Sequence, residues 1–332
     1  MRIILLGPQR RPTVDAVARS LDLDGPVATI SAGWQEQELD YGELSALLGG
    51  RDINLGLYGR WLDVQERDPE YAAGERRLAE VIAGLAELYL VRLDYALQAV
   101  QTLLRRAGAN GDDAAVSAAV ADALAQAVTA VRELDEAHLR RVNEVRAEFF
   151  DAMAPHDRPV IAAHRAAVAG LMGECAAVAM AGGHVGVLTD LLHLFNVAAA
   201  LHSAEAGRLS GPGPGAGSGD AELPVIAWSA GAMALTGRIV LFHDRAPQGP
   251  GHPEVYGTGL SLLRDVVLLP HAKARLLLGD QALMAVFARR FAPARCVLLE
   301  QGTRIDTSGD GGWPPGARVL GEDGLVHSLE DA

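Results

Sequence analysis

The chain has 332 residues, of which 49% are hydrophobic and 21% are charged, and its formal net charge is −13. At roughly 150 residues per domain, this length allows one large domain or two ordinary ones, and the apolar content is too high for a disordered chain. The excess of acidic residues argues against partners such as nucleic acid or anionic membranes, because binding to either needs a basic patch.

Cysteine content and the apolar runs indicate the compartment. The two cysteines, Cys175 and Cys296, cannot form a disulfide framework, which favours a reducing environment. The apolar run at the start, Met1–Gly7, is too short for the core of a signal peptide. No run of about 18 apolar residues is free of polar breaks, so we expect a cytoplasmic protein with no membrane partner.

The first sixty or so residues alternate short apolar runs with helical spacing. Strands are predicted over Arg2–Gly7, Val27–Ser31 and Ile53–Tyr58, and a helix over Pro12–Leu21. Short apolar strands separated by helices are typical of a parallel sheet covered on both faces.

Residues 63–154 have a different composition, dominated by Ala, Leu, Glu and Arg. Apolar residues recur at three- and four-residue steps between Leu78 and Tyr89, as in an amphipathic helix. The run Gly108–Gly111 breaks the pattern, and Asp112 or Asp113 is a candidate cap for a second helix. The segment therefore predicts a long helical hairpin whose outer face is solvated or binds a partner. An apolar stripe left uncovered on it would favour a homodimer.

Strand–helix alternation returns after Pro159 and continues to the end of the chain. Strands are predicted over Ala176–Ala181, Leu223–Trp228, Ile239–Phe242, Val266–Leu269 and Arg295–Glu300. Helices are predicted over Val160–Leu171, Val185–His202, Ala230–Leu235 and Leu276–Phe291, and a terminal hairpin is predicted over Arg318–Ser328. Residues 208–222 are rich in Gly and Pro and predict a flexible loop, with a domain linker as the alternative. The pattern indicates one α/β domain over residues 1–332 with a helical insertion.

The sharpest chemical signal is a serine between an apolar strand and a helix. Ser229 lies in the sequence Ala227-Trp-Ser-Ala-Gly231, and this small-x-Ser-x-Gly pattern is typical of a nucleophile elbow. The helix that follows starts with unpaired N–H groups, so the Ala230 N–H is a candidate oxyanion donor. A plain strand–helix turn with a capping serine is the alternative.

Two histidines follow predicted strands. His271 comes after Val266–Leu269, at the carboxyl edge where α/β sites form, and is the candidate general base. His184 follows the pair Gly182-Gly183, whose backbone can approach a ligand closely and bind an anion, although a tight turn is the commoner role of such a pair. No HExxH, CxxC or GxxxxGK[ST] motif is present, so no metal or nucleotide cofactor is expected.

Several of these segments together resemble the aspartyl dipeptidase and cyanophycinase family of serine peptidases, which shares its fold with the class I glutamine amidotransferases. In chain order the resembling segments are Ser31–Gln35, Gly182–His184, Ala227–Ala232, Pro270–His271 and Leu298–Gly302. The resemblance covers roughly residues 1–62 and 170–332 and is interrupted by the predicted hairpin, which short members of the family lack.

The resemblance implies a three-layer parallel-sheet sandwich and a serine peptidase or amidase that acts on a small peptide or amide. Ser229 would attack a carbonyl, His271 would take its proton, and Gly183 with Ala230 would hold the oxyanion. An acid between the serine and the histidine completes such a triad. Asp244 ranks first for this role, with Glu254 and Asp265 as competitors.

The chain also departs from the family pattern. His184 replaces an asparagine, and Gln301 replaces a glutamate, in loops that meet the substrate, so the resemblance leaves open whether aspartyl specificity is retained. Ser229 occupies the position of the amidotransferase cysteine, which argues against glutaminase activity. The alternative is a catalytically inactive binding or scaffold protein on the same fold, with the hairpin as its interaction surface.

Overall fold

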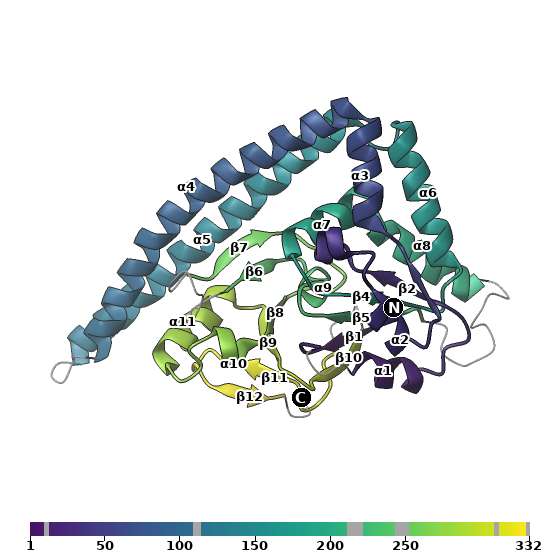
Figure 1. The fold of residues 1–332 in the computed structure, drawn as a ribbon. Helices are drawn as coiled ribbons and strands as arrows, with labels where there is room; N and C mark the ends of the chain where they lie inside the picture. The colour runs from purple at the N-terminus through teal and green to yellow at the C-terminus, as the bar shows by residue number, and fades with distance from the viewer. Residues whose placement is uncertain (10–12, 109–113, 211–221, 243–251, 309–311, 330–332) are drawn as a thin grey trace.

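The structure is a computed structural model, and it describes the whole chain except residues 10–12, 109–113, 211–221, 243–251, 309–311 and 330–332. It is a mixed α/β fold with a long helical insertion (Figure 1).

A six-stranded sheet forms the centre of the α/β body, with strand order β10-β1-β5-β4-β2-β3. Its strands are β1 (Arg2–Leu6), β2 (Val27–Ile30), β3 (Asp52–Asn54), β4 (Ala177–Met180), β5 (Pro224–Trp228) and β10 (Arg304–Ser308). The neighbours β1, β5, β4, β2 and β3 are parallel, and β10 pairs antiparallel with β1. The carboxyl ends of five strands therefore meet at one edge of the sheet.

Helices cover both faces of this sheet. Alternate residues of each strand point to opposite faces, so Ile3 and Val225 belong to one apolar core whereas Ile4 and Ile226 belong to the other. The core that contains Ile4 is covered by α1 (Val14–Ser20) and α2 (Gly42–Leu47). The larger core is covered by α6 (Pro159–Gly173), α7 (Val185–Leu194) and α8 (Val197–Ser210).

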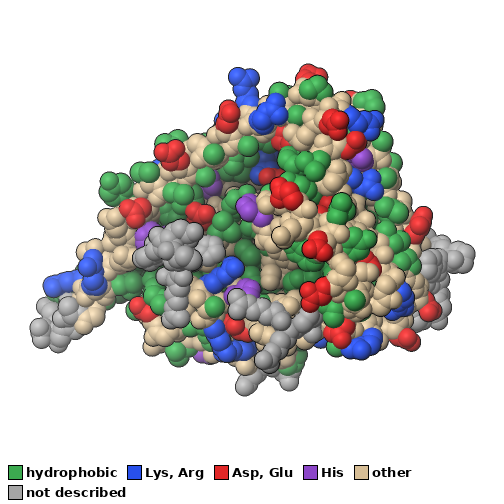
Figure 2. All heavy atoms as spheres, in the orientation of Figure 1, with side chains coloured by type: hydrophobic (Ala, Val, Ile, Leu, Met, Phe, Trp, Pro, Cys, Tyr) green, Lys and Arg blue, Asp and Glu red, His purple; other side chains and the backbone are tan. Residues whose placement is uncertain are grey.

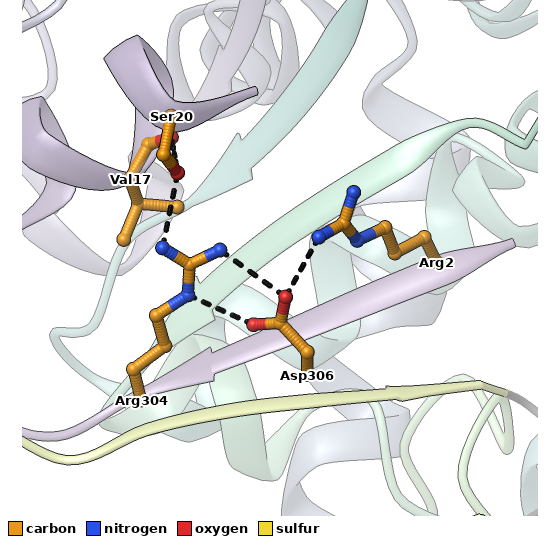
Figure 3. Close-up of polar contacts among 5 residues, drawn as sticks. All are labelled: Arg2, Val17, Ser20, Arg304 and Asp306. Atoms are coloured by element: carbon orange, nitrogen blue, oxygen red, sulfur yellow. Dashed lines mark hydrogen bonds and ion pairs between the residues drawn. The ribbon is translucent and has the colours of Figure 1, made fainter. Parts of the chain in front are cut away.

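Polar contacts fasten the antiparallel edge strand β10 to its neighbours (Figure 3). Asp306 on β10 accepts hydrogen bonds from Arg2 on β1 (2.8 Å) and from Arg304 (2.9 Å). Arg304 also donates to the Ser20 hydroxyl at the end of α1 (3.0 Å), and that hydroxyl donates to the Val17 carbonyl (2.7 Å). The edge strand is thus fixed both to the sheet and to the helix layer.

A second sheet extends the body with strand order β12-β11-β9-β8. It comprises β8 (Val266–Pro270), β9 (Arg295–Leu299), β11 (Arg318–Leu320) and β12 (Val326–Ser328). Near it lie the helices α9 (Ala230–Met233), α10 (Ala272–Arg275) and α11 (Gln281–Phe291) and a two-stranded ribbon of β6 (Ile239–Leu241) and β7 (Glu254–Gly257). Strands β8 and β9 are parallel. Because α9 packs against β8, the end of β5 lies near the second sheet.

The insertion consists of two long helices, α4 (Pro69–Gly108) and α5 (Ala114–Met153), which pack against each other in opposite directions (Figure 1). The helix α3 (Leu57–Arg67) leads from β3 to the insertion, and the 3₁₀ helix η1 (Ala32–Gln37), which follows β2, contacts α3. The first long helix begins at Pro69, and Asp63, where the insertion is predicted to begin, lies inside α3. The predicted caps Asp112 and Asp113 lie outside the described residues.

A buried polar network attaches the hairpin to the body. Arg290 of α11 donates two hydrogen bonds to the Asp135 carboxylate of α5, both 2.7 Å long, and Tyr89 of α4 donates to the same carboxylate (2.8 Å). Arg290 also donates to the Pro253 carbonyl (2.7 Å), and the Val255 N–H of β7 donates to the Tyr89 hydroxyl (3.1 Å). Four elements therefore share one network.

Much of the hairpin surface is apolar and exposed. An 18-residue stretch of α5 has a mean hydropathy of 1.6 with only 11% of it buried, and by length and composition α5 is the one single helix in the described part of the chain apolar enough to cross a membrane. The bent pair α7 and α8 passes the same test only when taken together, and its helices pack inside the body. On α4, Leu88 is 66% exposed and Tyr95 is 70% exposed.

Two predicted elements have different boundaries in the structure. The predicted strand Ile53–Tyr58 ends at Asn54, because Gly56 adopts a left-handed conformation and a helix starts directly after it. The Glu38 carboxylate accepts the Gly59 N–H (3.0 Å) in the first turn of that helix. The predicted helix Val185–His202 is two helices, α7 and α8, bent by 62° at the break.

Candidate active site

Ser229 occupies the turn between β5 and α9. Its backbone has φ of 51° and ψ of −123°, a conformation that is strained for any residue other than glycine. The adjacent turn is equally tight, because a Cβ on Gly231 would lie 2.7 Å from the Ala181 carbonyl oxygen. The sequence Ser-Ala-Gly therefore has its glycine at the position where β4 leaves no room for a side chain.

The glycine pair after β4 lies against this serine. A Cβ on Gly182 would lie 2.8 Å from the Ser229 Cβ and 3.5 Å from both the Ser229 hydroxyl oxygen and the Ala230 nitrogen. Gly183 has φ of 125° and packs against Gly33 of η1, and the His184 N–H donates to the Gly33 carbonyl (2.7 Å). The loops after β2, β4 and β5 thus meet at Ser229.

The His184 side chain has a structural role at this edge. Its Nδ1 accepts the Val187 N–H (3.2 Å) and so caps α7. Tyr256 of β7 reaches the same place, since a Cβ on Gly186 would overlap the Tyr256 hydroxyl and would lie 3.2 Å from the His184 ring. Burial raises the pKa of Tyr256 to about 12, so its hydroxyl stays protonated and can donate a hydrogen bond. Sequence reasoning missed Tyr256, and its short strand gives no signal for it.

His271 follows β8 and starts α10. It has left-handed backbone geometry, with φ of 60° and ψ of 30°, and its N–H donates to the Leu299 carbonyl of β9 (3.1 Å). In the described part of the chain no hydrogen bond joins the Ser229 hydroxyl to the His271 ring. The two residues come from the carboxyl ends of β5 and β8, and α9, which begins next to Ser229, packs against β8.

Glu300 fixes the segment that carries His271. Its Oε1 accepts the Lys273 N–H at the start of α10 (2.7 Å). Its backbone packs against Gly7 at the end of β1, where a Cβ would overlap the Glu300 carbonyl oxygen. The loop Leu298–Gly302 therefore links the ends of β1, β8 and β9, a role for Glu300 that the sequence comparison of this loop did not indicate.

The three acids considered as orienting groups differ in their positions. Asp244 lies outside the described residues. Asp265 precedes β8 whereas His271 follows it, so a strand of about 20 Å separates the two residues and the expectation that Asp265 competes for the role is wrong. Glu254 starts β7, where burial raises the pKa of its carboxyl and Arg290 opposes the increase.

Both cysteines are buried, and burial raises their pKa values, to about 11 for Cys175 and about 12 for Cys296. Such thiols are protonated at neutral pH and are poor nucleophiles. Within the described ranges, no group of three or more His, Cys, Asp or Glu side chains is arranged to hold a metal ion.

The geometry thus joins Ser229, the glycine pair and η1 at one edge, with His271 and Glu300 on the neighbouring sheet. Comparison of the sequence with known protein families and with curated proteins finds no match.

Proposed function

We propose that this chain is a serine peptidase- or amidase-like hydrolase that acts on a small peptide or amide. The observation that carries the proposal is the backbone of Ser229, a non-glycine residue held at a strained positive φ between a buried strand and a helix. Such strain costs roughly 1–3 kcal/mol and is concentrated at functional sites. A strained serine in a strand-to-helix turn is the nucleophile elbow of the α/β hydrolases.

The proposed fold is the three-layer sandwich of the class I glutamine amidotransferases with a helical insertion. The parallel order β1-β5-β4-β2-β3, with helices on both faces, supports this assignment. In that arrangement β5 is central, so its carboxyl end is flanked by loops on both sides and suits a nucleophile.

In the proposed reaction the Ser229 oxygen attacks the substrate carbonyl carbon while His271 takes the hydroxyl proton. The Ala230 N–H, at the first position of α9, and a backbone N–H of the glycine pair stabilise the oxyanion. The C–N bond then breaks, and His271 gives the proton to the leaving amine. Water then attacks the acyl-serine carbonyl carbon while His271 takes a proton from it. The bond between the acyl group and the Ser229 oxygen breaks, and His271 returns the proton to that oxygen. Catalytic hydrogen bonds often close only around a substrate, so an open Ser229–His271 pair is compatible with this scheme.

A turnover assay on a panel of dipeptides and small amides tests the proposal. We expect hydrolysis by the wild type and loss of several orders of magnitude in Ser229→Ala, because serine and histidine act as a unit. Ser261→Ala is the matched control, since Ser261 is also a serine with positive φ but is exposed away from the strand ends. Equal activity in Ser229→Ala and wild type would reject the catalytic assignment.

The second candidate function is a binding or scaffold protein on the same fold. The exposed apolar residues of α4 favour it, because large exposed apolar patches mark interaction surfaces. Absence of turnover together with a partner or second copy bound at the hairpin would support this alternative.

A further inference from the structure

A cavity of about 330 Å³ lies where the base of the hairpin meets α3 and α7. We call it the insertion pocket. Figure 2 shows that the molecular surface is hollowed between the hairpin and the α/β body. The volume is within the roughly 300–1,000 Å³ range of small-molecule sites.

The walls of the insertion pocket are unusually aromatic. Five of the sixteen aromatic residues of the chain line it: Tyr58, Trp61, Tyr71, Phe149 and Phe150. They come from three different helices and contact one another, with ring centroids 5.2 Å apart for Tyr58 and Trp61 and 5.5 Å apart for Tyr71 and Phe149. Such a concentration of rings offers electron-rich faces to a bound cation.

A carboxylate is positioned among these rings. Glu75 of α4 accepts hydrogen bonds from Trp61 Nε1–H (2.8 Å) and Gln65 Nε2–H (2.7 Å), and both reach the same oxygen, Oε2. Among the described residues no hydrogen bond is made to the other oxygen, Oε1. Burial raises the pKa of the Glu75 carboxyl and the nearby Asp190 adds to this effect, whereas the hydrogen bonds from Trp61 and Gln65 and the charge of Arg76 oppose it in part. A bound cation would therefore stabilise a charge that is now only partly compensated.

The other charges of the pocket do not favour an anionic ligand. Asp190 of α7 forms an ion pair with Arg146 of α5, with Nη1 and Oδ1 2.8 Å apart, so these two charges balance. Arg76 also borders the pocket, but its side chain is exposed and screened by solvent. Among the described residues that line the pocket, Glu75 is then the partly buried charge without an opposite charge bonded to it.

We propose that the insertion pocket binds an organic cation with an apolar body, such as an alkyl- or arylammonium compound. The ammonium group lies at Glu75 Oε1 and the apolar body lies against the aromatic rings. Each contact strengthens the other, because aromatic walls exclude water and a desolvated ion pair is stronger than an exposed one.

The insertion pocket also adjoins the candidate active site. Gln35 and Val187 line it. Gln35 belongs to η1, which also contains Gly33, and Val187 belongs to α7, which His184 caps. If the proposed hydrolase function holds, this pocket receives the cationic side chain of the substrate. The binding itself does not depend on chemistry at Ser229.

Calorimetric titration of the full chain with three ligands of similar size tests the proposal. Phenethylamine is cationic, phenethyl alcohol is neutral and 3-phenylpropionate is anionic at neutral pH. We expect the amine to bind at least about tenfold more tightly than the other two, since a charge-assisted contact contributes about this much. Equal binding of the three ligands, tighter binding of the anion, or no binding of the amine overturns the proposal.

Variants locate the binding site. Glu75→Gln should weaken amine binding at least about tenfold, whereas Glu80→Gln, an exposed change of equal charge on the same helix, should not. If Glu75→Gln does not fold, Phe149→Leu replaces it, and unchanged amine affinity in a folded variant of either kind contradicts the assignment. Ser229→Ala should bind the amine like the wild type, so failure of the hydrolase proposal is distinguishable from failure of this one.

Discussion

Ser229 and Gln35 have almost the same backbone conformation, with φ of 51° and 57° and ψ of −123° and −125°. Both residues follow parallel strands of the central sheet, Ser229 after β5 and Gln35 within η1 after β2, and Gln35 lines the insertion pocket. Strain of this kind persists only where the surrounding packing holds it. At Ser229 that packing involves Gly182 and Gly231, which lie so close to their neighbours that a side chain at either position would clash.

Replacing Ser229 by glycine should relieve this strain. We expect Ser229→Gly to have a free energy of unfolding about 1 kcal/mol higher than that of Ser229→Ala, because glycine adopts positive φ without a steric penalty. Urea denaturation of the two variants, which both lack the hydroxyl, measures the difference. A lower stability of the glycine variant would show that the turn is not strained.

His138 of α5 should make stability depend on pH. Its ring stacks on Tyr89 with centroids 4.1 Å apart, and burial lowers its pKa below the usual 6.5, an effect that Asp135 partly opposes. Below about pH 6.5 the unfolded chain therefore binds more protons than the folded chain, and the stabilisation falls as pH decreases. It is fully present above that pH.

Denaturation of wild type and His138→Gln over pH 5 to 8 measures this effect. The free energy of unfolding of the wild type should exceed that of the variant by more at pH 8 than at pH 5. A difference that stays constant over this range would show that His138 titrates alike in the folded and unfolded chains.

At the scale of elements, the attachment of the hairpin depends on the buried Arg290–Asp135 pair, whose side chains are 3% and 1% exposed. Asp135→Ala should lower the free energy of unfolding by about 3–5 kcal/mol, because it leaves the Arg290 charge buried without its partner. The exposed pair Arg141–Glu144 is the control, and Glu144→Ala should cost less than about 1 kcal/mol. Similar losses in the two variants would contradict the anchoring role.

The elements differ in how far the sequence determines them. The strand before Ser229 and the helix after it were predictable because an uninterrupted apolar run ends at small residues that only a tight turn requires. The boundary between β3 and α3 was not, because Ile53, Leu55 and Leu57 continue one apolar pattern across a change of conformation at Gly56. Strand β10 (Arg-Ile-Asp-Thr-Ser) was missed because half-exposed edge strands carry polar residues that resemble a loop.

Contacts between distant residues limited the prediction of the site. The positions of Ser229, the glycine pair and His271 at strand ends follow from local patterns and from the rule that parallel strands end at one edge. The capping of α10 by Glu300 and the bond from Trp61 to Glu75 depend on how separate elements pack. No local spacing encodes such contacts, so the insertion pocket was not predictable from the sequence.

At the scale of the whole molecule, the hairpin presents an apolar seam to solvent. Val81, Leu88 and Tyr95 recur at seven-residue steps along α4, and all three are exposed. Glu87 and Arg92 flank the seam five residues apart, the spacing at which parallel helices of two copies form ion pairs. This self-complementary charge pattern favours a second copy of the chain as the partner.

Light scattering after size exclusion should therefore give the mass of a dimer for the wild type. Leu88→Arg should shift the protein to monomer, because it places a charge in the apolar seam. Ala83→Arg introduces the same charge at an exposed position of α4 off the seam and should leave the dimer intact. A monomeric wild type, or a dimer that resists Leu88→Arg, would contradict the seam as the interface.

Labelling by a fluorophosphonate probe tests whether Ser229 is a nucleophile that His271 activates. The rate of labelling is followed by intact mass, and the modified residue is identified by peptide mapping. We expect one label per chain, located on Ser229, and a labelling rate that is lower by orders of magnitude in His271→Ala. Absence of labelling in the wild type, a label on another residue, or an unchanged rate in His271→Ala would contradict it.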